Sequence, residues 1–429
     1  MLKDDILYWI WLAEKCGIES KDFPRLISRI PDPFEIYRLE SEEIDAFNFI
    51  GRALKLKLTQ KSLESAYSIL KYCRKNDVDI ITYADRRYPE RLRNIENPPV
   101  LLYCLGELPD LNRRLCVGVV GMRELSAYGA QMAYKISYEL ASGGACIISG
   151  MASGVDSMAA CGALEARGST VAVLGSGIDI VYPPENKKLY TCIKHQGAVI
   201  TEYPPSTPPY ASNFPKRNRI ISGLSQAVLV VEGNLSSGSL ITAKYATKQG
   251  RDVFAMPGKI NESNSDGPNE LIRSGVNVAL SAEDILDRYS LLYYDKLDMG
   301  ELNRSKKYSD FELRFVKRYG VKLKDIYGDN EDKKQKAKPK AEKKALSEPD
   351  TAVQKSEDKK EDIGAIADKL AGLDELTVRV FGMMPEGRAV SIDEVVSWGI
   401  GISEAVTALS MLEINGAIRS VPGGTYIKQ

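Results

Sequence analysis

The sequence has a single histidine, no paired cysteines and no long apolar run. His195 alone argues against histidine-rich metal sites and against Ser-His-Asp catalysis. The seven cysteines show no CxxC spacing, so neither a zinc site nor a disulfide framework is predicted. No apolar run approaches the roughly 18 residues of a membrane span, and the N-terminus lacks a signal-peptide pattern. We therefore expect a soluble, cytoplasmic protein without a metal or other cofactor.

The formal net charge is zero, because 58 cationic side chains balance 58 acidic ones. Any binding of nucleic acid must therefore come from a local patch of cations rather than from the field of the whole protein. The length of 429 residues suggests roughly two to four domains. A hydrophobic content of 44% is sufficient for several cores.

Composition divides the chain into four parts. Residues 1–75 have apolar residues at helical spacing, interrupted by prolines, and predict a small helical module. Residues 76–288 alternate apolar runs with helical patterns, which predicts an α/β fold with a doubly wound parallel sheet. Residues 289–362 are expected to be a tether that ends in a disordered, highly charged linker. Residues 363–429 show helices followed by a hairpin, the order of a winged helix.

Glycine-rich turns follow several of the predicted strands. Sheets of this kind bind ligands beyond the carboxyl ends of their strands, so these turns should line one edge of the sheet. The turns are Gly121-Met122-Arg123, Ser149-Gly150, Gly175-Ser176-Gly177 and Glu232-Gly233. No GxxxxGKS/T stretch is present, and the turn at 175–177 lacks the third glycine of GxGxxG. A P-loop and a dinucleotide site are therefore both disfavoured.

The segment FPKRNRIISGLS at residues 214–225 places three cations within four residues. We interpret it as a cationic turn before a buried strand at residues 227–231. The Ser/Gly-rich stretch at 236–239 then begins a helix, where backbone N–H groups can approach an anion. An ordinary solvated basic turn is the alternative for this segment alone. Several such turns with cations nearby make a phosphate-binding cleft the favoured interpretation, and the cations are Arg123, Arg217, Arg219 and Lys244.

Aromatic side chains near this cleft are candidates for stacking on nucleobases. They are Tyr182, Tyr203 and Phe214. Packing beneath the loops is an equal alternative for each tyrosine.

The ordered motifs of the core resemble the DNA processing protein A family, DprA/Smf, over residues 77–288. The resemblance is strongest over residues 214–225, 237–243 and 249–258. It implies an extended Rossmann-like core, and more loosely a SAM-like N-terminal module and a C-terminal winged-helix domain. It also implies a homodimer that binds and protects single-stranded DNA and loads the RecA recombinase during natural transformation, without catalysing a reaction.

The cleft and the resemblance together assign a set of residues to single-stranded DNA. They are Gly121, Arg123, Ser149, Gly150, Phe214, Lys216, Arg217, Asn218, Arg219, Ser237, Gly238, Ser239 and Lys244. The sequence departs from the family pattern at two positions. Met122 stands where serine or threonine is usual, and Ala160 stands where the family has histidine.

Two other functions stay open at this point. The core also resembles the "lonely guy" nucleoside-monophosphate phosphoribohydrolases, and Glu202 and Glu232 would then be the candidate acid and base. Residues 232–239 lack the PGGxGT stretch of those enzymes, however. The third possibility is an adaptor in which DNA binding is secondary and the winged-helix domain docks partners.

Overall fold

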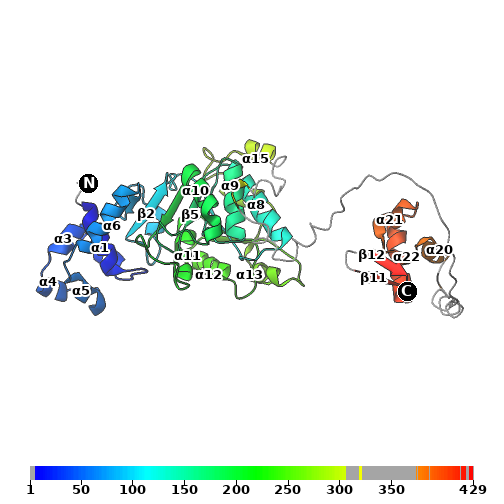
Figure 1. The fold of residues 1–429 in the computed structure, drawn as a ribbon, viewed down its shortest axis with the longest axis horizontal. Helices are drawn as coiled ribbons and strands as arrows, with labels where there is room; N and C mark the ends of the chain where they lie inside the picture. The colour runs from blue at the N-terminus through cyan, green and yellow to red at the C-terminus, as the bar shows by residue number, and fades with distance from the viewer. Residues whose placement is uncertain are drawn as a thin grey trace, which may run out of the picture. The chain divides into compact units, whose positions relative to one another are not determined.

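The computed structural model describes residues 5–305, 318–320, 373, 375–385, 387–415, 417–421 and 425–428. The chain divides into two compact units, Met1–Lys340 and Ala341–Gln429 (Figure 1). The charged linker expected over residues 328–362 lies outside the described residues. No helix in the described ranges is long and apolar enough to cross a bilayer.

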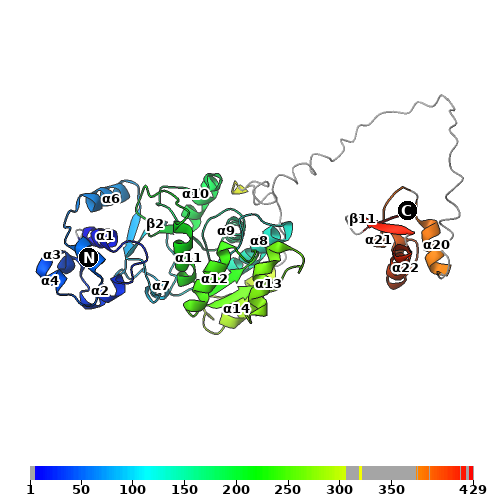
Figure 2. The same ribbon diagram turned by 90° about the horizontal axis from the view of Figure 1, so that it is seen from below.

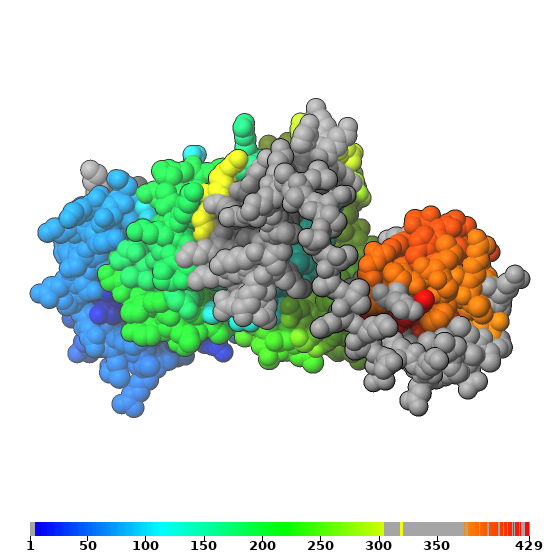
Figure 3. Space-filling model, turned by 45° about the vertical axis from the view of Figure 1, so that its right-hand side comes forward, coloured from blue at the N-terminus to red at the C-terminus, as the bar shows by residue number. Residues whose placement is uncertain are grey.

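The N-terminal part of the first unit is helical, as predicted. Its helices are α1 (Asp5–Cys16), α2 (Phe23–Arg29), α3 (Pro33–Arg38), α4 (Ser41–Asp45), α5 (Arg52–Leu58) and α6 (Glu64–Lys75). Prolines lie in the first turns of α2 and α3, where a helix needs no backbone N–H donor. Helix α1 packs against the first two strands of the sheet, and Figure 3 shows these helices (blue) directly against the neighbouring surface of the sheet domain.

The core of the first unit is a nine-stranded sheet of order β1-β2-β6-β5-β4-β3-β7-β8-β9 in the described part of the chain. The strands are β1 (Asp79–Thr82), β2 (Leu101–Gly106), β3 (Cys116–Val120), β4 (Cys146–Ser149), β5 (Thr170–Val173), β6 (Ala198–Thr201), β7 (Ala227–Val230), β8 (Asp252–Ala255) and β9 (Asn277–Val278).

Strands from β6 through β9 in this order run parallel, whereas β2 is antiparallel to both β1 and β6. Strands β3 to β7 are buried along their whole length, which is why they read as continuous apolar runs in the sequence. The chain winds outward from β3 in one direction through β4, β5 and β6, and resumes on the other side of β3 with β7. The predicted doubly wound sheet is confirmed, and its switch point lies between β3 and β7.

Helices cover both faces of this sheet. One face packs against α8 (Ala127–Ser142), α9 (Val155–Glu165), α10 (Lys187–Gln196) and α14 (Glu283–Tyr289). The other packs against α7 (Glu90–Arg93), α11 (Asn213–Leu224), α12 (Gly238–Lys248) and α13 (Asp266–Arg273). Figures 1 and 2 show α11 and α12 side by side on this second face.

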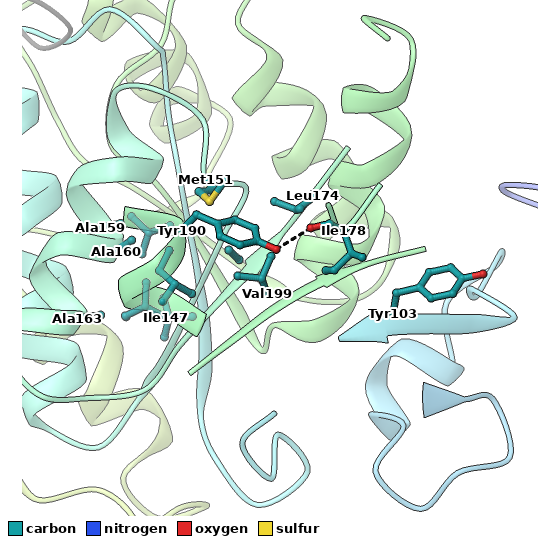
Figure 4. Close-up of a cluster of buried hydrophobic side chains, with 14 of the residues drawn as sticks. Tyr103, Ile147, Met151, Ala159, Ala160, Ala163, Leu174, Ile178, Tyr190 and Val199 are labelled. Atoms are coloured by element: carbon teal, nitrogen blue, oxygen red, sulfur yellow. Dashed lines mark hydrogen bonds between the residues drawn. The ribbon is translucent and has the colours of Figure 1, made fainter. Parts of the chain in front are cut away.

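Small side chains let α9 approach the sheet closely. Figure 4 shows Ala159, Ala160 and Ala163 among the buried side chains of this cluster. In the same cluster the Tyr190 hydroxyl donates a hydrogen bond to the carbonyl oxygen of Ile178 (2.6 Å). Because Ala160 is completely buried, the histidine of the family pattern would have to displace α9 from its neighbours.

The tether predicted from residue 289 onward is described over residues 289–305 and 318–320, where it includes a helix. Helix α15 (Met299–Ser305) packs on α8, and Leu302 is completely buried. Further along, the Tyr319 hydroxyl donates to the Glu165 carboxylate (2.8 Å). Leu302 and Tyr319 therefore belong to the apolar cluster of the first unit, whereas Leu291 and Leu292 are exposed.

The second unit contains α20 (Glu375–Met383), β10 (Val390–Ser391), α21 (Ile392–Ser397), α22 (Ile402–Ile414), β11 (Ile418–Val421) and β12 (Thr425–Lys428). Its strands form a small antiparallel sheet of order β10-β12-β11. A separate cluster that includes Val380, Leu409, Leu412 and Ile418 forms its core. The predicted helices and hairpin are therefore present.

A charged contact ties α14 to the first residue of β8. Asp252 accepts hydrogen bonds from Arg288 Nε (2.6 Å) and Nη2 (2.8 Å) and from the Tyr289 hydroxyl (2.6 Å). The bonds from Arg288 hold the pKa of the Asp252 carboxyl below its ordinary value of 3.8. A fork-shaped contact of this kind fixes the helix in one orientation.

We predict that Asp252→Asn lowers the free energy of unfolding by about 1–2 kcal/mol at pH 7, because charge-assisted bonds become weaker neutral ones. Since the folded pKa is depressed, this contribution is present above the unfolded pKa and is lost as the pH falls through the folded pKa. Urea denaturation of both proteins at pH 7 and at a pH below 3 measures the difference. The control Asp110→Asn removes an exposed ion pair with Arg113 and should change stability by less than about 0.5 kcal/mol.

Candidate functional site

A cavity of about 620 Å³ opens at the switch point of the sheet. Its walls are the loop after β3, the loop after β7 and the first turns of α11 and α12. The sequence-predicted residues that line it are Gly121, Arg123, Phe214, Arg217, Asn218, Ser237, Gly238 and Ser239. We call this cavity the edge pocket.

The prediction of a cationic turn within residues 214–225 is wrong, because residues Asn213–Leu224 form helix α11. Pro215 lies in the first turn, where the helix needs no N–H donor. At the other end, Arg91 Nε donates to Leu224 O (3.2 Å) and Arg251 Nη2 donates to Gly223 O (3.4 Å). These cations satisfy C-terminal carbonyls and match the negative end of the helix dipole. The first turns of α11 form one wall of the edge pocket.

Arg217 forms the floor of the edge pocket. Its Nη1 donates to the carbonyl oxygens of Gly150 (2.7 Å) and Val173, and its Nε donates to Asn218 Oδ1 (3.2 Å). Only 4% of the residue is exposed, and this burial lowers the pKa of Arg217 to about 10. The guanidinium therefore stays cationic at neutral pH, as a positive charge held in a fixed position.

Arg123 supplies a second cation beside an aromatic pair. Its guanidinium lies 5.4 Å from the centre of the Phe214 ring, and that of Arg217 lies 5.9 Å from the same ring. Tyr182 contacts Phe214 with ring centres 5.4 Å apart and an interplanar angle of 39°. Arg123 itself is exposed. Cations and aromatic faces therefore share one wall of the edge pocket.

The opposite wall is the N-terminus of α12. Ser237 caps this helix, and its hydroxyl lies 2.8 Å from that of Ser239. Asn218 Nδ2 donates to Gly238 O (3.3 Å), which joins α12 to α11. Hydroxyl groups and a helix N-terminus favour an anion at this wall.

Asp156 also lines the edge pocket, although the sequence-based assignment omitted it. Its Oδ2 accepts hydrogen bonds from the backbone N–H groups of Gly150 (3.0 Å) and Ala152 (3.2 Å). Burial raises the pKa of the Asp156 carboxyl, and nearby Arg217 opposes the rise. An acidic residue in the first turn of a helix that follows a strand and a glycine was the available sequence signal. The carboxylate ties the loop after β4 to the start of α9.

The other five predicted residues, Ser149, Gly150, Lys216, Arg219 and Lys244, do not line the pocket in the described part of the chain. Ser149 is buried at the end of β4, and a Cβ atom at Gly150 would lie 2.4 Å from the guanidinium of Arg217. Gly150 is thus needed to seat Arg217. Lys216 of α11 and Lys244 of α12 are not among the residues that line the edge pocket.

Arg219 is the clearest difference from the predicted cationic groove. Only 2% of it is exposed, and its Nη2 donates to the carboxylate of Glu202, which is also buried. Glu19, in the loop between α1 and α2, approaches Arg219 Nε to 3.7 Å. Arg219 therefore joins α11 to β6 and to the N-terminal module beneath the surface. Tyr203 is similarly buried and donates to Asn213 O (3.3 Å), which favours the packing alternative for this tyrosine.

The two carboxylates considered for catalysis lie outside the edge pocket. Glu202 is buried against Arg219, and Glu232 accepts hydrogen bonds from Ser126 at the start of α8. The carboxylates that line the pocket in the described residues are Glu124 and Asp156. No group of three or more potential metal ligands occurs in the described part of the chain.

The sequence and the fold of this chain are similar to those of proteins in one known family. The model of the family described as DNA recombination-mediator protein A matches residues 79–290. The DNA processing protein DprA of Bacillus subtilis is 39% identical over 219 residues, which cover 51% of this chain and 74% of that protein. The Smf protein of Synechocystis sp. is 34% identical over 311 residues, which cover 70% of this chain and 76% of that protein.

Among solved structures, DNA processing protein A of Streptococcus pneumoniae is 33% identical and superposes with a TM-score of 0.58. The match covers 66% of this chain and 97% of that one. Identity at this level over three quarters of full-length relatives, together with the shared sheet, assigns the chain to a family. It belongs to the DprA/Smf family of DNA recombination-mediator proteins.

Proposed function

We propose that this protein binds single-stranded DNA in the edge pocket, protects it, and delivers it to the RecA recombinase in the cytoplasm during natural transformation. The observation that carries the proposal is the juxtaposition of Arg123, Arg217 and Phe214 opposite the N-terminus of α12. Membership of a recombination-mediator family supports the role in recombination.

The cations and α12 match the sugar-phosphate backbone of the strand. Arg123 is exposed and can pair with a phosphate as the strand arrives, whereas Arg217 is fixed by its bonds to Gly150 and Val173. A guanidinium that is already held in place loses little conformational entropy on binding. Phosphate neutralisation of this kind makes the affinity depend steeply on salt.

The aromatic pair explains why a single strand is favoured over a duplex. Phe214 and Tyr182 offer ring faces within the pocket, and stacking contributes about 1–3 kcal/mol per base in single-strand sites. Bases of a duplex are already stacked and paired, so they cannot use these rings without unpairing. The pocket of about 620 Å³ limits this contact to a short stretch of the strand.

The site supports a binding role rather than hydrolysis of a nucleotide. The phosphoribohydrolase alternative needs an acid and a base beside the ligand, and both Glu202 and Glu232 are committed to structural contacts outside the pocket. The buried carboxylate that lines the pocket, Asp156, is already bonded to two backbone N–H groups. No observation favours the enzyme over the mediator.

A homodimer is part of the proposal, with the edge that β9 forms in the described part of the sheet as the contact. Strand β9 ends the sheet and pairs with β8 on one side. Val278 and, just beyond the strand, Leu280 are exposed at 42% and 71%. An exposed edge strand with apolar side chains at and beside it favours pairing with another strand, and a second copy offers the same edge.

We also propose that the second unit is a winged-helix domain, since its elements occur in the order helix, strand, two helices and hairpin. Helix α22 contains no lysine or arginine, which is unfavourable for phosphate contact. The proposal therefore gives DNA binding to the edge pocket and contact with proteins to this domain. RecA as the partner rests on the family alone.

We predict that Arg123→Ala weakens binding of a labelled oligothymidylate at least about tenfold and reduces the salt slope by about 0.7, as expected for one lost phosphate contact. Fluorescence anisotropy across a salt series, with single-stranded and duplex probes, measures both quantities. The control Arg113→Ala removes an arginine that is 80% exposed and follows no strand end. An equal loss in this control, or equal affinity for duplex, would contradict the proposal.

We predict that Phe214→Leu weakens single-strand binding by about 5- to 100-fold, the range of one lost stacking contact, while the side chain stays apolar. Tyr203→Phe, which changes a buried hydroxyl outside the pocket, should bind as the wild type does. The same anisotropy assay compares them. Unchanged affinity in Phe214→Leu would remove stacking from the account.

We predict that Leu280→Glu converts the homodimer to a monomer, because like charges would meet at the paired edges. Light scattering after size-exclusion chromatography gives the mass directly. Leu56→Glu, at an exposed position of α5, is the matched control and should stay dimeric. A monomeric wild type, or a dimer that survives Leu280→Glu, would place the contact elsewhere.

A further inference from the structure

The N-terminus of α8 is occupied by a carboxylate of the protein itself. Glu232, two residues beyond the end of β7, accepts hydrogen bonds from the backbone N–H of Ser126 (3.1 Å) and from the Ser126 hydroxyl. Ser126 is the N-cap residue of α8, whose 16 residues give it a full helix dipole. In doubly wound sheets the helix after the first strand commonly directs its N-terminus at a ligand phosphate. Here an internal anion already fills that position.

The residues around Glu232 leave a buried space for its carboxylate. Only 2% of the residue is exposed. A Cβ atom at Gly129 would lie 2.1 Å from Glu232 Oε2, so a glycine in α8 makes room for the side chain. Burial raises the pKa of the Glu232 carboxyl, and the hydrogen bonds from Ser126 oppose this rise.

The same residue also fixes the loop that carries Arg123. The backbone oxygen of Glu232 accepts a hydrogen bond from Met122 N (3.0 Å), and Met122 O accepts one from Val155 N (3.2 Å). Gly154, at a φ of +81°, lies so close that a Cβ atom there would meet the carbonyl oxygens of Met122 and Arg123 at 2.3 and 2.5 Å. The backbone at Arg123 is thus held on both sides, although its side chain is exposed.

We propose that Glu232 is a positioning residue for DNA binding: it occupies the N-terminus of α8 as an internal anion and thereby sets the loop that presents Arg123. The external phosphate is consequently directed to Arg123 and to the N-terminus of α12 rather than to α8. This role goes beyond single-strand binding itself and rests on the proposed function of the edge pocket.

A purely electrostatic effect of the Glu232 charge would change the affinity for DNA in the opposite direction, and this difference makes the proposal testable. Removing a negative charge near an anion site should tighten binding of DNA. Glu124 is the matched control, because it is an exposed carboxylate that lines the edge pocket. Glu124→Gln should therefore tighten binding. Glu232→Gln should weaken it, because an amide N–H₂ group cannot accept the hydrogen bonds that the second carboxylate oxygen accepts.

The experiment measures oligothymidylate affinity by anisotropy for the full chain carrying Glu232→Gln, Arg123→Ala or both. We expect Glu232→Gln to bind about three- to tenfold more weakly, the loss expected when one charge-assisted contact is misplaced. In the Arg123→Ala background the same change should have no effect, because Glu232 acts through Arg123. Affinity equal to the wild type, tighter binding, or an equal loss in both backgrounds would overturn the proposal.

A milder variant covers the case in which Glu232→Gln does not fold. Ser126→Ala removes the hydroxyl that donates to the carboxylate and that accepts from Gly129 N, without changing residue 232 itself. It should weaken binding in the same direction and again only when Arg123 is present. Wild-type protein that fails to bind single strands would refute the proposed function, whereas normal wild-type binding with unchanged variants would refute the role of Glu232 alone.

Discussion

The architecture of the site depends on the contacts that internal carboxylates make at the carboxyl edge of the parallel sheet. Parallel strands bring their carboxyl ends, and the helix N-termini that follow them, to the same edge. Several positive helix ends therefore meet there. The Glu232 carboxylate accepts a hydrogen bond from a backbone N–H group at the start of α8, and the Asp156 carboxylate accepts one from the loop that leads into α9. The N-terminus of α12 lines the pocket together with Arg123 and Arg217, which favours an external anion there.

Helix α11 connects this edge to the rest of the first unit. Its first turns carry Phe214, Arg217 and Asn218 into the pocket. Its last carbonyls are held by Arg91 and Arg251, and its middle is anchored through buried Arg219 to Glu202 and Glu19. A buried ion pair is weak evidence for stability but favours one arrangement over others. The N-terminal helices therefore contribute to the position of the pocket wall without lining it.

The sequence was sufficient for features that depend on local pattern. The buried strands and the turns at Gly121 and Gly150 were predicted because continuous apolar runs and strand-ending glycines are local signals. Helix α11 was not predicted because three cations and Pro215 precede its buried apolar residues and interrupt their helical pattern. These residues include Ile220, Ile221 and Leu224. The burial of Arg219 was not predictable, since its partners lie 17 and 200 positions away in the sequence. Asp156 was overlooked because its role depends on a loop that folds back onto it.

The most direct test of the account is photocrosslinking of a 5-iodouracil-substituted single strand to the full chain, followed by mapping of the modified peptide. The account predicts crosslinks at Phe214 or Tyr182, the ring faces of the edge pocket. Crosslinks confined to the second unit, or to the amino-terminal edge of the sheet, would contradict it.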